Sequence, residues 1–266
     1  RSFLQAEFGR ASYLGTDKVA RDQAGARMVS YFSSMLGPLG SNAQTADAIE
    51  AEFFDLLDVL DAHFQHVPYL LGGHPSLADF GFMAPLFAHL GRDPSPSQRL
   101  RLRAPNVARW IERMNLAVIP DGEFPDVEPA FDADDRVPPT LLPLLALIFR
   151  DWTPELLANA QAFNAWASAH LHLADGAFVA LDGKKRVHPH VGPIAYRWRG
   201  CTVERVSAPQ TLWHFGRFQQ QLVACDGEAL DRLLMVLEQA GGQEACVLKL
   251  VRPIERRHYG LVIGPS

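Results

Sequence analysis

The sequence is poor in cysteine, in lysine and in long apolar runs, and each shortage excludes a class of protein. The three cysteines, Cys201, Cys225 and Cys246, are odd in number, widely spaced and form no C-x-x-C motif. We therefore expect reduced thiols in a cytoplasmic protein rather than a disulfide framework. The longest apolar run, residues 141–149, is far shorter than the roughly 18 residues that suggest a membrane span. We expect no membrane partner and no signal peptide.

Charge and composition exclude further classes. Lysine occurs at four positions only, and the formal net charge is −5, so electrostatics gives no reason to expect a nucleic-acid partner. Apolar residues make up 48% and charged residues 21% of the chain, which is typical of a globular protein and not of a disordered one. With 266 residues the chain can form one large domain or two modest ones.

The first half of the chain has the periodicity of helices. Met28, Phe32 and Met35 recur at helical spacing and predict a helix over residues 24–36, which the glycines of residues 37–40 end. Apolar residues recur every three to four positions from residue 49 to residue 64 and predict an amphipathic helix with Thr45 as its N-cap. Pro68 marks the end of that helix.

The stretch LLGGHPSLADFGFMAPLFAHLGRD, residues 70–93, combines a turn, a cap and an internal proline. Its two glycines permit a tight reversal. The hydroxyl of Ser76 and the carboxylate of Asp79 have the spacing of a capping box, in which each side chain accepts a hydrogen bond from the other residue's amide. Pro85 lies opposite Gly81, four residues earlier, and predicts a kink in a buried helix that runs to His89.

The remaining sequence predicts fewer and shorter elements. Residues 95–105 are interpreted as a link to an amphipathic helix over residues 105–114, and residues 119–139, rich in Pro and Asp, as a linker. Two helices follow, with Thr153 as the N-cap of the second. Residues 193–208 alternate and carry Arg199-Gly200, which predicts a β-hairpin. A helix over residues 227–240 and strands over residues 245–253 and 259–264 complete the pattern.

These motifs carry a family likeness. The segment PYLLGGHPSLADFGFMAPLFAHLGRD, preceded by the helix of residues 49–64 and followed by RAPNVARWIERM, resembles the C-terminal helical domain of glutathione S-transferases. The likeness covers roughly residues 25–114, and the chain from residue 137 onward resembles the extension of a bacterial subgroup with longer chains. We therefore expect a mainly α fold: a helical bundle over residues 1–118, a linker over residues 119–139, and a smaller α+β extension with short β-hairpins over residues 140–266.

The resemblance also implies a function. Proteins of this family conjugate or transfer glutathione, their co-substrate, to a small hydrophobic electrophile, and many are homodimers. Their N-terminal thioredoxin-like domain holds glutathione and the catalytic residue, and no such pattern occurs here. We expect it to be missing upstream, because the sequence opens with RSFLQAEFGR and has no initiator methionine. The resemblance thus assigns no catalytic residue to this chain, and the alternative is a non-catalytic binding or scaffold protein of the same fold.

Several residues invite both a functional and a structural interpretation. Ser76 and Asp79 could be mistaken for a nucleophile and its base, but a capping box explains the pattern better. Met28, Phe32 and Met35 either line the wall of a hydrophobic substrate pocket, as the family implies, or form an ordinary core stripe.

Other candidates favour the structural interpretation. The pairs His170/His172 and His188/His190 have no accompanying Cys, Asp or Glu cluster, so we expect no metal site. The arginines of residues 99–103 are interpreted as a solvated face near a carboxylate, and the cysteines as unreactive.

Overall fold

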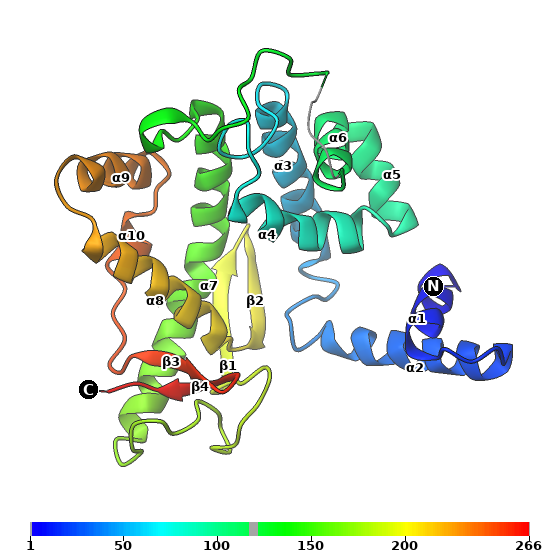
Figure 1. The fold of residues 1–266 in the computed structure, drawn as a ribbon. Helices are drawn as coiled ribbons and strands as arrows, with labels where there is room; N and C mark the ends of the chain where they lie inside the picture. The colour runs from blue at the N-terminus through cyan, green and yellow to red at the C-terminus, as the bar shows by residue number, and fades with distance from the viewer. Residues whose placement is uncertain (1, 117–121, 266) are drawn as a thin grey trace. The chain divides into compact units, whose positions relative to one another are not determined.

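A computed structural model describes residues 2–116 and 122–265 and confirms the mainly α fold (Figure 1). Ten α-helices are present in the described residues, together with two small antiparallel sheets. The helices are α1 (Ser2–Ser12), α2 (Lys18–Met35), α3 (Ala46–Phe64), α4 (Leu77–Pro85), α5 (Pro94–Arg103), α6 (Pro105–Met114), α7 (Leu142–Ala169), α8 (Pro209–Ala224), α9 (Gly227–Gln239) and α10 (Gln243–Cys246). Within the described ranges no helix is both long and apolar enough to cross a membrane.

Both sheets are hairpins of two strands. The strand β1 (Pro193–Trp198) pairs antiparallel with β2 (Cys201–Val206), and Arg199 and Gly200 form the turn that the sequence predicts. Both turn residues have positive φ, 45° and 81°, as a type I′ turn requires. The strand β3 (Ile254–Arg257) pairs with β4 (Gly260–Ile263).

The chain divides into two compact units that interleave along the sequence. One unit contains residues 1–49, 158–213 and 250–266, and the other contains residues 50–157 and 214–249. The predicted domains, 1–118 and 140–266, instead follow chain order, and their boundaries remain a prediction. Residues 119–121 of the predicted linker lie outside the described residues.

In the first unit, α1 and α2 form a close helical pair. A Cβ atom on Gly25 of α2 would lie only 1.9 Å from the Gln5 carbonyl oxygen of α1, so only glycine permits this approach. The segment before α3 contacts the hairpin, because the Val206 amide donates to the Pro38 carbonyl over 2.9 Å. Thr45 stands directly before α3, and its carbonyl accepts from the Ile49 amide over 3.0 Å, but its side chain does not cap the helix. Its hydroxyl instead accepts from the Asn42 amide and donates to the Gly40 carbonyl, and so stabilises the preceding turn.

The second unit has one apolar core, built by the amphipathic helices that the sequence predicts. Phe64 of α3 and Trp110 of α6 stack with ring centroids 5.0 Å apart, and both are almost fully buried. The same core contains residues of α3, the loop before α4, the turn η1 (Leu86–Leu90), the segment from α5 to α6 and the region where α7 begins, namely Leu57, Leu60, Tyr69, Leu70, Leu86, Leu100, Ala104, Val107, Ile111, Leu141 and Leu144.

The helix that contains Pro85 changes its hydrogen-bond pattern at the proline, and, contrary to the sequence prediction, it is not buried as a whole. The predicted kink itself remains a prediction. The α-helical hydrogen bonds end at Pro85, which has no amide hydrogen, and a single π-helical turn, η1 (Leu86–Leu90), follows. Only Asp79 and Leu86 are buried in this segment, whereas Leu77 and Phe80 are 90% and 60% exposed. One face of α4 therefore packs on the core, and the opposite face is open.

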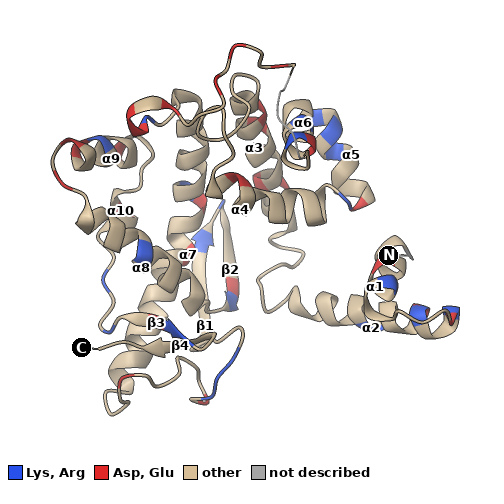
Figure 2. Ribbon diagram, in the orientation of Figure 1, with Lys and Arg blue, Asp and Glu red and all other residues tan. Residues whose placement is uncertain are grey.

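The interpretation of residues 95–105 as a link is wrong, because most of this segment forms the helix α5. Pro94 suits the first turn of that helix, and buried Leu100 anchors it in the core. Its arginines contact carboxylates of α3, as the interpretation of a solvated face requires: Arg99 pairs with Glu50, and Arg103 binds Asp58 through two hydrogen bonds of 2.7 Å. In Figure 2, α3 carries acidic segments and α5 carries basic ones.

The two helices predicted after residue 140 are one continuous helix, α7, with Pro154 inside it. Thr153 is buried within this helix and does not cap it. Apolar side chains on both sides of the proline are buried, among them Leu144, Leu156 and Phe163, and this tertiary packing outweighs the hydrogen bond that proline cannot donate.

Two further sequence interpretations need correction. Helix α8 carries no strong sequence signal and was not expected, and residues 245–253 form the end of α10 and irregular backbone instead of a strand. The helix over residues 227–240 and the final strand agree with α9 and β4.

Candidate functional site: a buried carboxylate and an open pocket

The capping box at the start of α4 has the geometry that the sequence predicts. Ser76 is the N-cap residue, with extended backbone angles of −100° and 170°, and its hydroxyl oxygen accepts from the Asp79 amide over 3.4 Å. The Asp79 carboxylate accepts in return from the Ser76 amide over 2.8 Å and from the Ser76 hydroxyl over 2.6 Å. The box therefore satisfies donors at both ends of the first helical turn.

The same carboxylate also binds two groups outside α4. Its second oxygen accepts from the Leu70 amide over 3.1 Å and from the Trp110 indole nitrogen over 3.0 Å, and the Asp79 side chain is completely buried. One ionised group thus joins the loop before α4, the start of α4 and the middle of α6. Hydrogen bonds to a charged acceptor are the stronger ones, and the positive end of the helix dipole adds to them.

The hydrogen bonds of Ser76 suit a structural role and not that of a nucleophile. The Ser76 hydroxyl donates its proton to a carboxylate that already accepts three other hydrogen bonds, and Ser76 is only 7% exposed. A substrate carbonyl has no access to that oxygen. The structural interpretation of Ser76 and Asp79 therefore has direct geometric support.

A buried histidine links the helical core to the start of α7. His63 Nδ1 lies 2.9 Å from the Thr140 hydroxyl, and Nε2 lies 3.3 Å from the Tyr69 carbonyl oxygen. Since a carbonyl only accepts, Nε2 carries the proton and Nδ1 accepts from Thr140. Burial lowers the pKa of His63 below its ordinary value of 6.5, although the Tyr69 carbonyl and the Asp79 charge oppose this shift.

Arg113 of α6 fixes the backbone around the same loop. Its buried guanidinium donates to the Pro68 carbonyl over 2.9 Å and to the Glu123 carboxylate over 3.1 Å, and it lies over the Phe124 ring at 5.0 Å. Residues 130–132 pair with the loop as well, because the Gly73 amide donates to Ala130. The described part of the predicted linker is therefore packed against the loop before α4.

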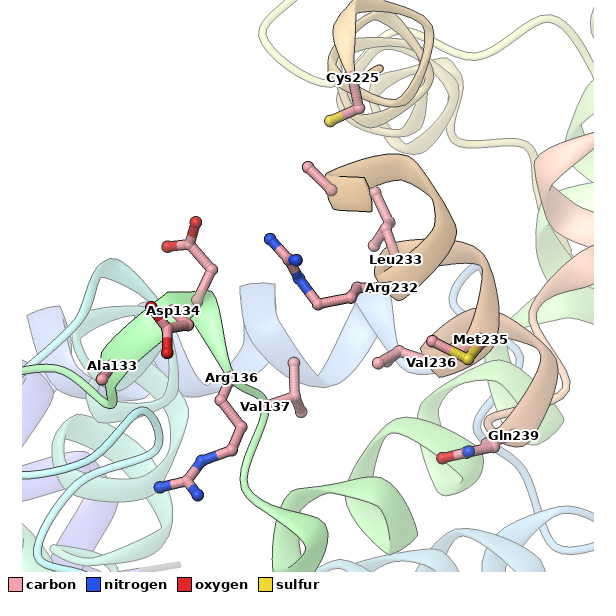
Figure 3. Close-up of a pocket in the computed structure, with 12 residues that line it drawn as sticks. Ala133, Asp134, Arg136, Val137, Cys225, Arg232, Leu233, Met235, Val236 and Gln239 are labelled. Atoms are coloured by element: carbon pink, nitrogen blue, oxygen red, sulfur yellow. The ribbon is translucent and has the colours of Figure 1, made fainter. Parts of the chain in front are cut away.

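An open pocket lies in the same unit. Its volume is about 640 Å³, and residues 133–137 and one face of α9 line it, together with Cys225 (Figure 3). Most of the exposed lining surface is apolar, and four charged residues also line the pocket: Asp134, Asp135, Arg136 and Arg232.

Comparison with known proteins connects the segment that contains the capping box to a family. The family model described as "Glutathione S-transferase, C-terminal domain" matches residues 43–113. The match covers α3 to α6, and with them the capping box, the π-helical turn after Pro85 and the buried carboxylate. The chain contains a glutathione S-transferase C-terminal domain. No curated protein and no solved structure matches the chain.

The predicted substrate residues, Met28, Phe32 and Met35, lie on α2, which precedes the matched segment in the sequence. Phe32 and Met35 are 47% and 36% exposed, so neither belongs to a buried core stripe, and Phe32 stacks on Phe8 of α1 at 5.1 Å. Neither they nor Met28 line the pocket beside α9. Their place in a substrate pocket remains a prediction.

The histidine and cysteine candidates lie mostly at or near the surface. His172, His188 and His190 are exposed, and across residues 2–116 and 122–265 no group of His, Cys, Asp or Glu is arranged to hold a metal ion. The three cysteines are unbridged, and burial raises the pKa of the Cys246 thiol, which lowers its reactivity.

Sequence reasoning missed most partners of Asp79. Leu70 and Trp110 lie 9 and 31 residues from Asp79, and the local pattern that reveals a capping box contains no sign of them. A polar N–H on the apolar face of an amphipathic helix is the one available signal, because a buried indole needs an acceptor. His63 and Arg113 were missed for the same reason.

Proposed function

We propose that the chain is the helical part of a glutathione transferase-like protein, which conjugates or transfers glutathione to a hydrophobic electrophile. The observation that carries this proposal is the family match over residues 43–113, together with the buried capping box inside it. In such a reaction the glutathione thiolate attacks the electrophile, a carbon–sulfur bond forms and the leaving group departs. The group that stabilises the thiolate belongs to a thioredoxin-like domain, so no residue of this chain is proposed as catalytic.

The helical domain contributes packing and one wall of the electrophile pocket. We keep Met28, Phe32 and Met35 as the candidates for that wall, because the corresponding helix of the family lies there and the structure leaves Phe32 and Met35 exposed. A homodimer and a cytoplasmic location are parts of the same proposal. Size-exclusion chromatography with light scattering tests the dimer.

The activity is tested with the longest natural product of the gene. Purified protein is incubated with glutathione and chlorodinitrobenzene, and thioether formation is followed by absorbance, with a reaction lacking protein as the background. Glutathione binding is measured in parallel by calorimetry. We expect conjugation above background. Absence of both conjugation and glutathione affinity, in a product without a thioredoxin-like segment, would overturn the proposal.

One observation favours the alternative, a non-catalytic binding protein of the same fold. The open pocket is lined by residues 133–137 and by residues of the 225–239 segment, all outside the matched segment. A protein that binds a small molecule there needs no glutathione. Ligand binding at this pocket in a protein without glutathione affinity distinguishes the alternative from the transferase.

A further inference from the structure

The pocket beside α9 has the dimensions of a small-molecule site. Its volume of about 640 Å³ falls within the range of roughly 300–1,000 Å³ that is usual for such sites. Two segments form it, the short 3₁₀ turn η2 (Ala133–Asp135) with the two residues after it, and α9. Both segments belong to one compact unit, so the pocket needs no assumption about how the two units are placed.

The interior of the pocket is apolar on both sides. Val137 contributes from one wall, and Leu233 and Val236 contribute from α9, where a spacing of three residues places them on the same face. Figure 3 shows Val137 and Val236 pointing toward one another. Both α9 side chains are half-buried, so a ligand that covers them removes further apolar surface from water.

Charges of opposite sign face each other across the opening. Asp134 and Asp135 line the pocket from η2 and Arg232 lines it from α9, and Figure 3 shows the Arg232 side chain extending toward the segment that carries Asp134. Arg232 lies 3.6 Å from Glu228, which is 94% exposed, and Arg136 lies 3.8 Å from Asp132. These contacts are longer than hydrogen bonds, so both guanidinium groups retain donors for another acceptor.

The backbone of η2 adds a second observation. Asp134 and Asp135 both have positive φ, 59° and 52°, a region that costs energy for residues other than glycine. Such residues cluster at ligand sites, where the strained conformation holds a side chain in place. Here the two residues are neighbouring aspartates that line a largely apolar pocket.

We propose that this pocket binds a small zwitterionic molecule with an apolar tail, the chemistry of an α-amino acid with a long aliphatic side chain. The ammonium group binds the carboxylates of Asp134 and Asp135, the carboxylate binds Arg232, and the tail lies over Val137, Leu233 and Val236. A simple anion or cation satisfies only one side of the opening and meets the like charge of the other. This site lies outside the transferase domain, and the proposal does not depend on glutathione chemistry.

The test compares three probes that share one tail: 2-aminooctanoate, octanoate and octylammonium. Calorimetry with the full chain measures the three dissociation constants at neutral pH. We expect 2-aminooctanoate to bind about tenfold more tightly than either singly charged probe, which corresponds to one additional charge-assisted contact. Equal affinities for 2-aminooctanoate and one singly charged probe, or no binding of 2-aminooctanoate, would overturn the proposal.

Variants assign each contact. Arg232→Gln should weaken binding of 2-aminooctanoate and octanoate but strengthen binding of octylammonium, because it removes the like charge that opposes the ammonium group. Asp134→Asn with Asp135→Asn should weaken 2-aminooctanoate and octylammonium, and asparagine tolerates the same positive φ, so the turn is retained. Leu233→Asn should weaken all three probes.

A matched control and a second readout keep the result specific. Leu234 is the neighbouring residue on α9, 47% exposed and outside the lining, so Leu234→Asn should change no dissociation constant. Bound 2-aminooctanoate should also slow alkylation of Cys225, which lines the pocket, and leave Cys201 unaffected. If Leu234→Asn weakens binding as much as Leu233→Asn, or Cys225 is not protected, the site assignment is wrong.

Discussion

Replacement of Asp79 by alanine tests the buried network most strongly. The carboxylate accepts hydrogen bonds from the Ser76 amide, the Ser76 hydroxyl, the Leu70 amide and the Trp110 indole. Alanine removes the acceptor of all four. The hydroxyl can rotate toward another acceptor, but the three N–H groups are fixed by backbone and ring packing.

The magnitude follows from those three donors. A buried donor without an acceptor costs about 1–3 kcal/mol, and partial entry of water reduces the sum, so we expect Asp79→Ala to lower the free energy of unfolding by about 3–6 kcal/mol. Ser76→Ala removes one weak acceptor and should cost about 1 kcal/mol. Asp79→Asn preserves volume but directs an amide donor at other donors, so it should also destabilise the protein, by about 2–4 kcal/mol.

Urea unfolding followed by tryptophan fluorescence measures these differences, provided that the slope of the transition is unchanged. Asp47 is the matched control, because it is an aspartate in the first turn of α3 and is exposed. Asp47→Ala should cost less than about 1 kcal/mol. If Asp79→Ala is no more destabilising than Asp47→Ala, the Asp79 carboxylate does not stabilise the protein through its hydrogen bonds to the loop before α4, to α4 and to α6.

Three other perturbations give independent checks. Burial lowers the pKa of His63 in the folded state, so the unfolded state binds a proton more readily, and the free energy of unfolding should fall as the pH drops below about 6.5. In urea melts at a series of pH values, His63→Gln should remove this dependence, whereas the variant of the exposed His66, His66→Gln, should retain it. Gly73→Ala should be strongly destabilising in thermal melts, because the added Cβ would lie 1.8 Å from the Glu128 carbonyl oxygen. Gly81→Ala should instead stabilise α4 by about 0.5–1 kcal/mol, because a Cβ there has no heavy atom within 4 Å. Arg199→Asn should raise the melting temperature, because asparagine prefers the positive φ of a type I′ turn; a lowered melting temperature would refute the assigned turn.

The parts of the fold that the sequence predicts well are those that depend on local interactions. A capping box needs two residues three positions apart, so Ser76 and Asp79 could be recognised without knowledge of their surroundings. The same is true of the turn at Arg199-Gly200 and of the apolar stripe of α6. Each of these elements is present at the expected position.

The errors have a common cause, which is packing between distant segments. Proline at residue 154 is a good first-turn residue, and only the burial of side chains before and after it makes α7 continuous. Residues 94–103 are rich in arginine and proline, and their helix is held by one buried leucine and by carboxylates of α3. Local propensity is outweighed in both cases by tertiary contacts.

The candidate sites were predicted to different extents. The two ends of the capping box were recognised, but the pocket beside α9 was not, because it combines residues 133–137 with residues about a hundred positions later. No pattern within either segment indicates the other. The helix α4 was expected to be buried, and the apolar stripe of α2 to line a substrate pocket or a core; periodicity alone cannot show what covers an apolar stripe.

The central claim is that residues 43–113 form a transferase helical domain joined by a buried carboxylate. The most direct test is the proton–nitrogen NMR spectrum of the protein with isotope-labelled tryptophan, in which the Trp110 signal is assigned by Trp110→Phe. We predict that the Trp110 indole proton exchanges slowly with solvent and shifts in Asp79→Asn more than the indole protons of the other four tryptophans. A Trp110 indole that exchanges rapidly and is unaffected by Asp79→Asn would contradict the claim.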